Sequence, residues 1–432
     1  MNLALRIYTA LWRVVLPLAF ARLWWRGRAE PLYRQHWRER LGWGGASLAS
    51  AERVDRRPVI WLHAVSLGET RAAAPLIAAL RSTLPGMRLL LTHMTATGRE
   101  AGQALLQPGD VQLWLPYDLP GAMRRFLARQ RPTCAVLMET EVWPNLAAQC
   151  RRAGVPLLLA NARLSARSAR RWQRWPSLAR VAWGGLHAAA QTADDARRIL
   201  DLGAAQATVL GNLKFDMQPD PGLQQQGRAW KAAAGRPVLL LASTRDSSGQ
   251  SEEALLLQAL PAALAQRVLL VWVPRHPQRF DAVAQLLAAH GLAVERRSAG
   301  GPTPQTTVWL GDSVGEMAAY YAMADAAFIG GSLLPLGGQN LIEACACGCP
   351  VVLGPSQFNF AAAAQAALEV GAAVQAADAG QVWAALAHWV DDPAARSEAA
   401  QQARAFATAH QGAAQRQAQW IAATLAAADR GQ

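Results

Sequence analysis

One acidic side chain lies where chemistry is expected: Glu69, within the stretch 63–70 of sequence HAVSLGET. An apolar run precedes this stretch and an alanine-rich helical pattern follows it, which predicts the first strand-to-helix turn of an α/β domain. Ligands of such folds bind at the carboxyl ends of the strands. A carboxylate at a helix start repels phosphate, but the helix dipole is expected to keep it ionised, which suits a general base. The alternative is that Glu69 only caps the helix.

A second strand end carries paired carboxylates. The apolar run 133–138 is followed by ETEVWPN at 139–145, in which Pro144 is placed to start a helix. Glu139 and Glu141 would then lie level with Glu69 at one edge of the sheet, as site residues. The alternative is that one of them caps the following helix.

A third strand end is basic. The run 155–160 is followed by NARLSARS at 161–168 and then by more arginines, and no acidic residue occurs between Glu141 and Asp194. Arginines without counter-charges suit the recognition of phosphate or carboxylate. We take Arg163 and Arg167 as candidate acceptor-binding residues; a solvated basic face is the alternative.

Alternating apolar runs and helical patterns predict a parallel sheet with helices on both faces. No G-x-G-x-x-G follows the first run, so a dinucleotide cofactor is not expected. Strands are predicted at 59–62, 88–93, 111–115, 133–138, 155–160, 186–191 and 207–210, and helices near residues 69, 97, 119, 144 and 192.

The stretch 211–216, GNLKFD, is followed by two prolines and a glycine, and is the predicted domain boundary. It contains Lys214, and Lys231 is the only other lysine of the chain. A lysine at such a boundary is placed to meet a phosphate or developing negative charge. The alternation then restarts, with strands predicted at 238–242, 268–273, 308–310, 326–329 and 351–353.

The strand ends of this second half are rich in small residues. Small residues at helix starts suit nucleotide phosphates, and a glutamate one turn in can hold ribose hydroxyls. His276 is either a ligand contact or a structural turn residue, and the final helices at 381–390 and 394–427 show no cluster of site-like residues. The strand ends are STR at 243–245, PRHP at 274–277, GDSVGE at 311–316 and GGS at 330–332, with GGQNLIE at 337–343 opening a helix.

Composition limits the class of protein. The chain has 432 residues, which is too long for a single hydrophobic core. At about 150 residues per domain, it is expected to form two or three domains. Its net charge of +13 implies an anionic partner, such as a membrane surface or a phosphorylated substrate, and no nucleic-acid motif is present. The five cysteines fit a reducing compartment, and the C-x-C-x-C run at 345–349 lacks zinc-site spacing, so small buried residues are favoured over a metal site.

The amino-terminal stretch 3–25 is apolar and aromatic, but arginines interrupt it and Pro17 would kink a helix. Its uninterrupted run, 14–21, is shorter than the roughly 20 residues that span a bilayer. Aromatic residues beside arginines indicate a segment that lies in the lipid headgroup region. A single membrane span, a signal peptide and a packed amphipathic helix are the alternatives, although no cleavage site follows.

Two similar α/β domains, with a nucleotide-type second half, predict the GT-B architecture of glycosyltransferases: two Rossmann-like domains with a crevice between them. We expect a membrane-anchor segment at 1–40, an acceptor-binding domain at 41–215 and a nucleotide-binding domain at 216–432, with the last helix able to cross back. No Asp-x-Asp motif stands in a suitable loop, and no metal is expected.

Over nearly its whole length the chain resembles the 3-deoxy-D-manno-octulosonic acid (Kdo) transferases of lipopolysaccharide synthesis. It departs from the family at Gln339, where a histidine is usual, and at 244–253, where the family has Thr-His-x-Gly-Glu-Glu. The matching stretches are LHAVSLGE at 62–69, LPYDLP at 115–120, METEVWPN at 138–145, ANARLSARS at 160–168, GNLKFD at 211–216, VPRHP at 273–277 and GGQNLIE at 337–343.

The resemblance implies inverting transfer of Kdo from CMP-Kdo to a hydroxyl of the tetraacyl lipid A precursor (lipid IVA), without a cofactor, at the cytoplasmic face of the inner membrane. It implies Glu69 as the base, with Glu139 and Lys214 stabilising the transition state. To these we add Ser66 and Gly68 as candidate acceptor contacts. The residues implied for CMP binding are Pro274, Arg275, Val314, Gly315, Glu316, Asn340, Leu341, Ile342 and Glu343.

Two other classes of function fit parts of the sequence. A sugar-nucleotide 2-epimerase shares the two-domain plan, but its soluble substrate leaves the amino-terminal stretch and the acid-free arginine stretch unexplained. A non-catalytic binder of anionic lipid leaves the nucleotide-type turns of the second half without a purpose.

Overall fold

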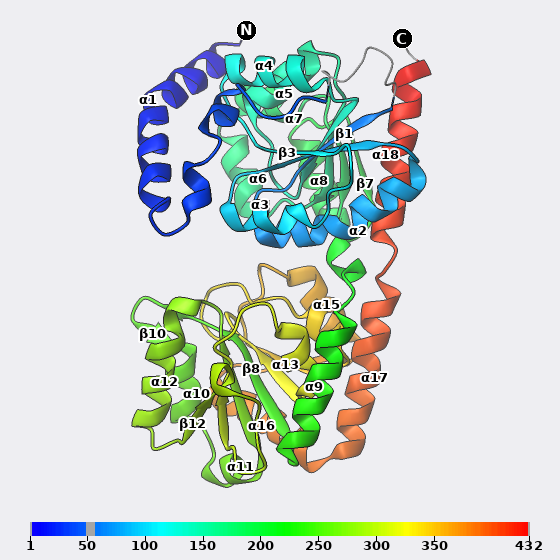
Figure 1. Ribbon diagram of the computed structural model, residues 1–432. Coiled ribbons are helices and arrows are strands. Elements are labelled where there is room, and N and C mark those ends of the chain that lie inside the picture. The colour runs from blue at the N-terminus through cyan, green and yellow to red at the C-terminus, as the bar shows by residue number, and fades with distance from the viewer. Residues whose placement is uncertain (1, 49–56, 431–432) are drawn as a thin grey trace. The chain divides into compact units, whose positions relative to one another are not determined.

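The computed structural model describes residues 2–48 and 57–430, which divide into two compact units with one seven-stranded parallel sheet each (Figure 1). The first unit lies within residues 1–217 and 412–432, and the second comprises residues 218–411. The predicted pair of parallel α/β sheets is therefore confirmed.

In the first unit the strand order is β3-β2-β1-β4-β5-β6-β7. The chain builds outward from β1 to β3 and then returns to place β4 on the other side of β1, so the order reverses between β1 and β4. In α/β sheets such a reversal is where ligands bind. The strands are β1 (Val59–His63), β2 (Arg88–His93), β3 (Val111–Trp114), β4 (Cys134–Met138), β5 (Leu157–Ala162), β6 (His187–Ala190) and β7 (Gln206–Val209).

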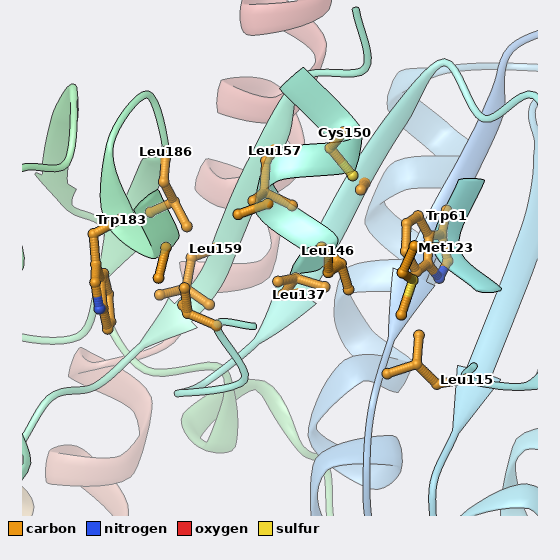
Figure 2. Close-up of a cluster of buried hydrophobic side chains, with 14 of the residues drawn as sticks. Trp61, Leu115, Met123, Leu137, Leu146, Cys150, Leu157, Leu159, Trp183 and Leu186 are labelled. Atoms are coloured by element: carbon orange, nitrogen blue, oxygen red, sulfur yellow. The ribbon is translucent and has the colours of Figure 1, made fainter. Parts of the chain in front are cut away.

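Helices cover both faces of this sheet, because its central strands are apolar on both sides. On one face, Trp61, Leu137 and Leu159 pack with Leu146 and Trp183 (Figure 2). On the other face the core includes residues of α2 and α18. The helices are α2 (Leu67–Thr83), α3 (Ala96–Gln103), α4 (Pro120–Gln130), α5 (Pro144–Arg152), α6 (Ala166–Gln173), α7 (Pro176–Trp183), α8 (Ala193–Asp201) and α18 (Ala413–Arg430), and the short 3-10 helices are η1 (Pro31–Arg34), η2 (Trp37–Leu41) and η3 (Leu213–Asp216).

The second unit repeats the plan, with strand order β12-β13-β11-β8-β14-β15-β16. The strands are β8 (Val238–Thr244), β11 (Leu269–Pro274), β12 (Val294–Arg296), β13 (Val308–Leu310), β14 (Ala326–Ile329), β15 (Val351–Leu353) and β16 (Ala373–Gln375), with a separate hairpin of β9 (Asp246–Ser247) and β10 (Gln250–Ser251). The helices are α9 (Pro221–Ala234), α10 (Glu252–Gln258), α11 (Ala262–Arg267), α12 (Phe280–Ala289), α13 (Met317–Met323), α14 (Ile342–Ala346), α15 (Ala361–Glu369), α16 (Ala379–Asp391) and α17 (Pro393–Ala409), with 3-10 helices η4 (Pro277–Arg279) and η5 (Arg297–Ala299).

The expectation of one long helix over 394–427 is wrong. Helix α17 ends at Ala409 and α18 begins at Ala413, because Gly412 between them has φ +90°, which is outside the helical region. The Asp216 carboxylate accepts hydrogen bonds from Gly412 N and Ala414 N and fixes the start of α18 beside η3. The last helix therefore packs with the first unit.

Helix α1 (Leu3–Arg26) runs uninterrupted through Pro17. One side is held by the first unit: Thr9 Oγ1 and Asn145 are hydrogen bonded, and Asn145 N in turn donates to the buried Asp118. By length and composition α1 is able to cross a membrane, with a mean hydropathy of 1.5 over its most apolar window. Its outward side carries large apolar residues three or four positions apart, which are Leu3, Ile7, Leu11, Val14 and Leu18.

Candidate active site

Glu69 lies in the first turn of α2, just beyond β1, and its carboxylate is already hydrogen bonded. Val65 N donates to Oε2 at 2.8 Å, and Ser66 Oγ donates to Oε1 at 3.1 Å. Ser66 is also the N-cap of α2, accepting from Glu69 N at 3.5 Å. Glu69 is thus part of the cap of its own helix, and these contacts hold the carboxylate in a fixed orientation.

The protonation of Glu69 differs from the expectation based on the helix dipole. Burial raises the pKa of Glu69 to about 7, and the charges of Glu139 and Glu141 raise it as well. The prediction that the helix start keeps this carboxylate ionised is wrong, because desolvation and two negative neighbours outweigh the stabilising hydrogen bond from Val65 N. Both protonation states are populated near neutral pH, which suits a group that accepts a proton from a hydroxyl.

Glu139 and Lys214 form an ion pair at the end of β4. Lys214 Nζ lies 3.1 Å from Glu139 Oε1, and each side chain is about one-fifth exposed. Glu139 has φ +55°, a left-handed conformation that is uncommon for this residue type and is held by the hydrogen bond from Glu139 N to Ala160 O. Because Glu139 also acts on the pKa of Glu69, the structure brings Glu69, Glu139 and Lys214 together in the first unit.

Lys214 is positioned by buried amides that the sequence analysis did not identify as important. The fully buried Asn161 side chain accepts from Leu213 N at 3.0 Å through its Oδ1. The backbone N–H of Asn161 donates to Gln417 Oε1 at 2.9 Å. Gln417 Nε2 then donates to Gly211 O. Asn161 lies in the stretch 160–168 that matches the family, whereas nothing in the alanine-rich sequence around Gln417 indicates that this side chain binds the 211–213 stretch.

The loop after β5 presents the predicted basic surface. Arg163 is half-buried, and Arg167 is exposed in the first turn of α6. The loop itself is fixed because Leu164 N donates to Asp195 Oδ1 and Leu164 O accepts from Arg198. Five arginines here are exposed and form no ion pair with any carboxylate of the described residues; they are Arg167, Arg170, Arg171, Arg174 and Arg180.

Ser66 and Gly68, the two other predicted acceptor contacts, differ in whether they are free to contact a substrate. The Ser66 hydroxyl is already used by the cap described above. Gly68 is exposed, and a Cβ at this position would meet no other atom within 4 Å. Packing therefore does not require glycine at position 68, and the backbone there faces open space.

The nine predicted CMP-binding residues all lie in the second unit. Arg275 follows β11, and its Nε donates to Gln339 Oε1 at 3.0 Å. Glu316 Oε1 accepts from Arg297, whereas Val314 is exposed and Gly315 has φ +93°.

The loop before α14 holds the rest of this set. Asn340 Oδ1 accepts from the N–H of Ile342, the first residue of the short helix α14, which fixes the turn that leads into this helix. The side chains of Leu341 and Ile342 are buried in the core, so these two residues have only backbone groups to offer a ligand. Pro274 ends β11, and Glu343 is half-buried in α14.

One of the small-residue strand ends of this unit, the stretch 330–332, is held from within the chain. The fully buried Glu252 carboxylate binds its N–H groups. It accepts from Gly331 N at 2.6 Å and from Ser332 N at 2.9 Å, and likewise from Arg245 N and Leu333 N. The chain thus supplies its own anion at this loop, and Glu252 fixes the ends of β8 and β14 relative to each other.

Comparison with known proteins identifies first the class and then the family. A crystal structure of a glycosyltransferase from Rickettsia africae ESF-5 matches with a TM-score of 0.60, over 88% of this chain and 100% of that one, at 12% identity. The two parallel sheets therefore have the GT-B architecture of glycosyltransferases.

Sequence comparison is more specific. Residues 35–217 match the family model described as 3-deoxy-D-manno-octulosonic-acid transferase (kdotransferase). The 3-deoxy-D-manno-octulosonic acid transferase of Bordetella pertussis is 46% identical over 424 residues, 95% of this chain and 97% of the relative. That of Haemophilus influenzae is 35% identical over 364 residues, 82% of each. The chain belongs to the family of 3-deoxy-D-manno-octulosonic acid (Kdo) transferases.

The buried carboxylate of Glu252 leads to a stability prediction. Glu252→Ala leaves two buried and two part-buried backbone N–H groups without their acceptor, and we expect it to lower the free energy of unfolding of the second unit by about 3 kcal/mol or more. Urea unfolding followed by circular dichroism measures the change.

Asp246→Ala is the matched control, because this acidic side chain on the adjacent hairpin is 57% exposed. Its ion pair with Arg279 lies at the surface, so the expected change is within about 1 kcal/mol. Equal unfolding midpoints for the two variants would contradict the role given to Glu252.

Proposed function

We propose that this Kdo transferase moves Kdo from CMP-Kdo to a hydroxyl of the tetraacyl lipid A precursor (lipid IVA), with inversion at the anomeric carbon. The observation that supports this most is the grouping of Glu69, Glu139 and Lys214 in the first unit. A raised carboxylate pKa beside a charge-paired lysine is the arrangement that a proton-accepting step followed by charge stabilisation needs.

In the proposed reaction the Glu69 carboxylate takes the proton of the acceptor hydroxyl. The hydroxyl oxygen forms a bond to the anomeric carbon of Kdo from one face, while the bond from that carbon to the phosphate oxygen of CMP breaks on the other face. The electron pair of the broken bond stays with the phosphate, so CMP leaves already ionised and needs no second acid. One displacement of this kind inverts the anomeric carbon.

Glu139 and Lys214 act on the charges of the transition state. Sugar transfer passes through a state with positive character at the anomeric carbon, which a carboxylate such as Glu139 stabilises. The Lys214 ammonium stabilises the negative charge that develops on the departing phosphate. We propose that fixed cations of the chain, among them Lys214 and Arg275, make a metal unnecessary.

The two substrates are assigned to different units. In the second unit, Arg275 and the backbone of the loop at 340–343 are proposed to hold CMP, together with residues 314–316. In the first unit, Arg163 and Arg167 are proposed to meet the phosphates of the acceptor, where guanidinium groups form paired hydrogen bonds with phosphate oxygens. Gly68, where the backbone faces open space, is proposed to let the acceptor approach Glu69.

We also propose that α1 anchors the protein at the cytoplasmic face of the inner membrane. Its outward residues are apolar, and at its carboxyl end Trp24 and Trp25 are exposed beside arginines. Exposed tryptophans and arginines at the end of an apolar stripe are typical of segments in the lipid headgroup region.

The direct test is incubation of the detergent-solubilised protein with CMP-Kdo and lipid IVA. We expect release of CMP and a lipid product heavier by whole Kdo units, measured by chromatography and mass spectrometry. A folded protein that releases no CMP would refute the transferase proposal, and lipid binding without CMP release would indicate a non-catalytic lipid binder.

Replacing the proposed base gives a second prediction. Glu69→Gln keeps the side-chain size but cannot accept the proton, and we expect transfer to fall by about 10²- to 10⁴-fold. Binding of CMP should be unchanged, because the proposed CMP-binding residues lie in the second unit. Loss of CMP affinity in this variant would contradict the assignment.

The pH dependence tests the same residue in the unchanged protein. Because Glu69 must be ionised to act, and burial raises its pKa to about 7, kcat/KM should rise with pH up to about 7 and then level off. Glu141→Gln is the matched variant: it removes a charge that raises the pKa of Glu69, so the rise should move to lower pH while activity remains. A shift to higher pH would contradict the electrostatic argument.

The basic surface gives a further prediction. The double variant Arg163→Ala/Arg167→Ala should raise the apparent KM for lipid IVA by about tenfold or more, since each charge-assisted hydrogen bond is worth about 1.5–3 kcal/mol. Steady-state kinetics with excess CMP-Kdo measures the change. Arg197→Ala, whose side chain is 68% exposed and paired with Asp194 on α8, is the control and should behave as the unchanged protein. An unchanged KM in the double variant would leave these arginines as a solvated surface.

A further inference from the structure

Arg245 lies at the point of the second sheet where an α/β fold binds ligands. Strand β8 is flanked by β11 on one side and β14 on the other. From β8 the chain first builds β11, β12 and β13 on one side, and then crosses back to place β14 on the other. The strand order therefore reverses between β8 and β14, and Arg245 directly follows β8 at its carboxyl end.

The surroundings of Arg245 connect it to Arg275. A Cβ added to Gly331 would lie 3.4 Å from Arg245 Cδ and 3.1 Å from Gln339 Nε2, so both side chains pass beside this glycine. The other end of the Gln339 amide, Oε1, accepts from Arg275 Nε at 3.0 Å. Arg245 thus passes beside the same glycine as the glutamine that binds Arg275, at the ends of the adjacent strands β8 and β11.

Both guanidinium groups lack a negative partner in the part of the chain that the structure describes. Neither forms an ion pair with a carboxylate of residues 2–48 or 57–430, and Arg245 Nε is buried without a hydrogen-bond partner among them. The nearby Glu252 carboxylate forms no ion pair with either guanidinium group, and its oxygens accept from backbone N–H groups instead.

A third arginine in the same region behaves differently. Arg279 makes two hydrogen bonds of 2.8 Å to Glu253 and also pairs with Asp246, so its charge is balanced. The positive charge of this region acts on His276: burial lowers its pKa, and the neighbouring arginines, Arg275 first and then Arg245 and Arg279, lower it further. Arg245 is half-buried and Arg275 is exposed beside it, so this pair of unbalanced guanidinium groups at a strand-order reversal is suited to bind an anion from outside the described residues.

We infer that Arg245, together with Arg275, binds an anionic group of the CMP-linked donor, with Gln339 as a positioning residue that orients Arg275. The inference rests on the proposed function and extends it to a residue outside the predicted CMP-binding set. The donor carries two oxyanions, the phosphodiester and the sugar carboxylate, and a guanidinium binds both with the same paired geometry.

The test compares the unchanged protein with Arg245→Gln and Arg245→Lys, all as the full chain in detergent. Calorimetric titration with CMP and with cytidine isolates the phosphate, and KM for CMP-Kdo reports the whole donor. In Arg245→Gln we expect either CMP affinity to fall by about tenfold while cytidine binding is unchanged, or CMP affinity to be unchanged while KM for CMP-Kdo rises by about tenfold. The first result assigns Arg245 to the phosphate and the second assigns it to the carboxylate.

Arg245→Lys keeps the charge without the planar fork, and should recover part of the lost affinity. Arg267→Gln is the matched control: this arginine precedes the amino end of β11, at the opposite edge of the same sheet, and pairs with Asp391 at the surface. It should leave all three measurements unchanged.

Arg245→Gln values within twofold of the unchanged protein, for both CMP affinity and donor KM, would overturn the inference. A general loss of cytidine binding would also overturn it, because that result indicates a structural role. Failure of the unchanged protein to bind CMP would instead refute the proposed function, so the two failures are distinguishable.

Discussion

The hydrogen bond from the Asn161 backbone N–H to the Gln417 side-chain amide is the constraint on which the first unit's candidate site depends. These two fully buried side chains join the end of β5, the stretch 211–213 and helix α18. Separating these segments would leave more buried polar groups without hydrogen-bond partners, so the segments have little freedom to move apart. Lys214 follows directly, and its ammonium is paired with Glu139, which in turn acts on the pKa of Glu69. The proton affinity of the candidate base is thereby connected to a helix at the far end of the chain.

In the second unit a buried side chain also holds a loop through its backbone groups, but here the side chain is a carboxylate. The Glu252 carboxylate, buried at the start of α10, holds the loop after β14 through its backbone N–H groups. Each unit thus orders a strand-end loop with a buried polar side chain contributed by another segment. Such loops are ordered before any ligand arrives, and ligand binding then has a smaller entropic cost.

Much of this architecture could be predicted from sequence because buried parallel strands are continuous apolar runs. Apolar runs such as 88–93 and 308–310 predict strands inside the two sheets. Because the carboxyl ends of parallel strands meet at one edge of a sheet, Glu69 and Glu139 are predicted to lie at that edge of the first sheet. Edge strands β12 and β16 are three residues long and partly exposed, so their sequences carry no such run. The raised pKa of Glu69 and the roles of Glu252 and Gln417 arise from contacts between distant segments, which local patterns do not encode.

The position of α18 has a consequence for how the chain folds during synthesis. Because residues of α18 complete the core on one face of the first sheet, the second unit is in effect an insertion within the first. On the ribosome, residues 218–411 have all emerged before the first unit obtains its last helix. A stop codon or a proteolytic cut near residue 411 would spare the second unit, yet would remove Gln417 and leave Asn161 N without its acceptor. The unit that is translated first is therefore the one that is finished last.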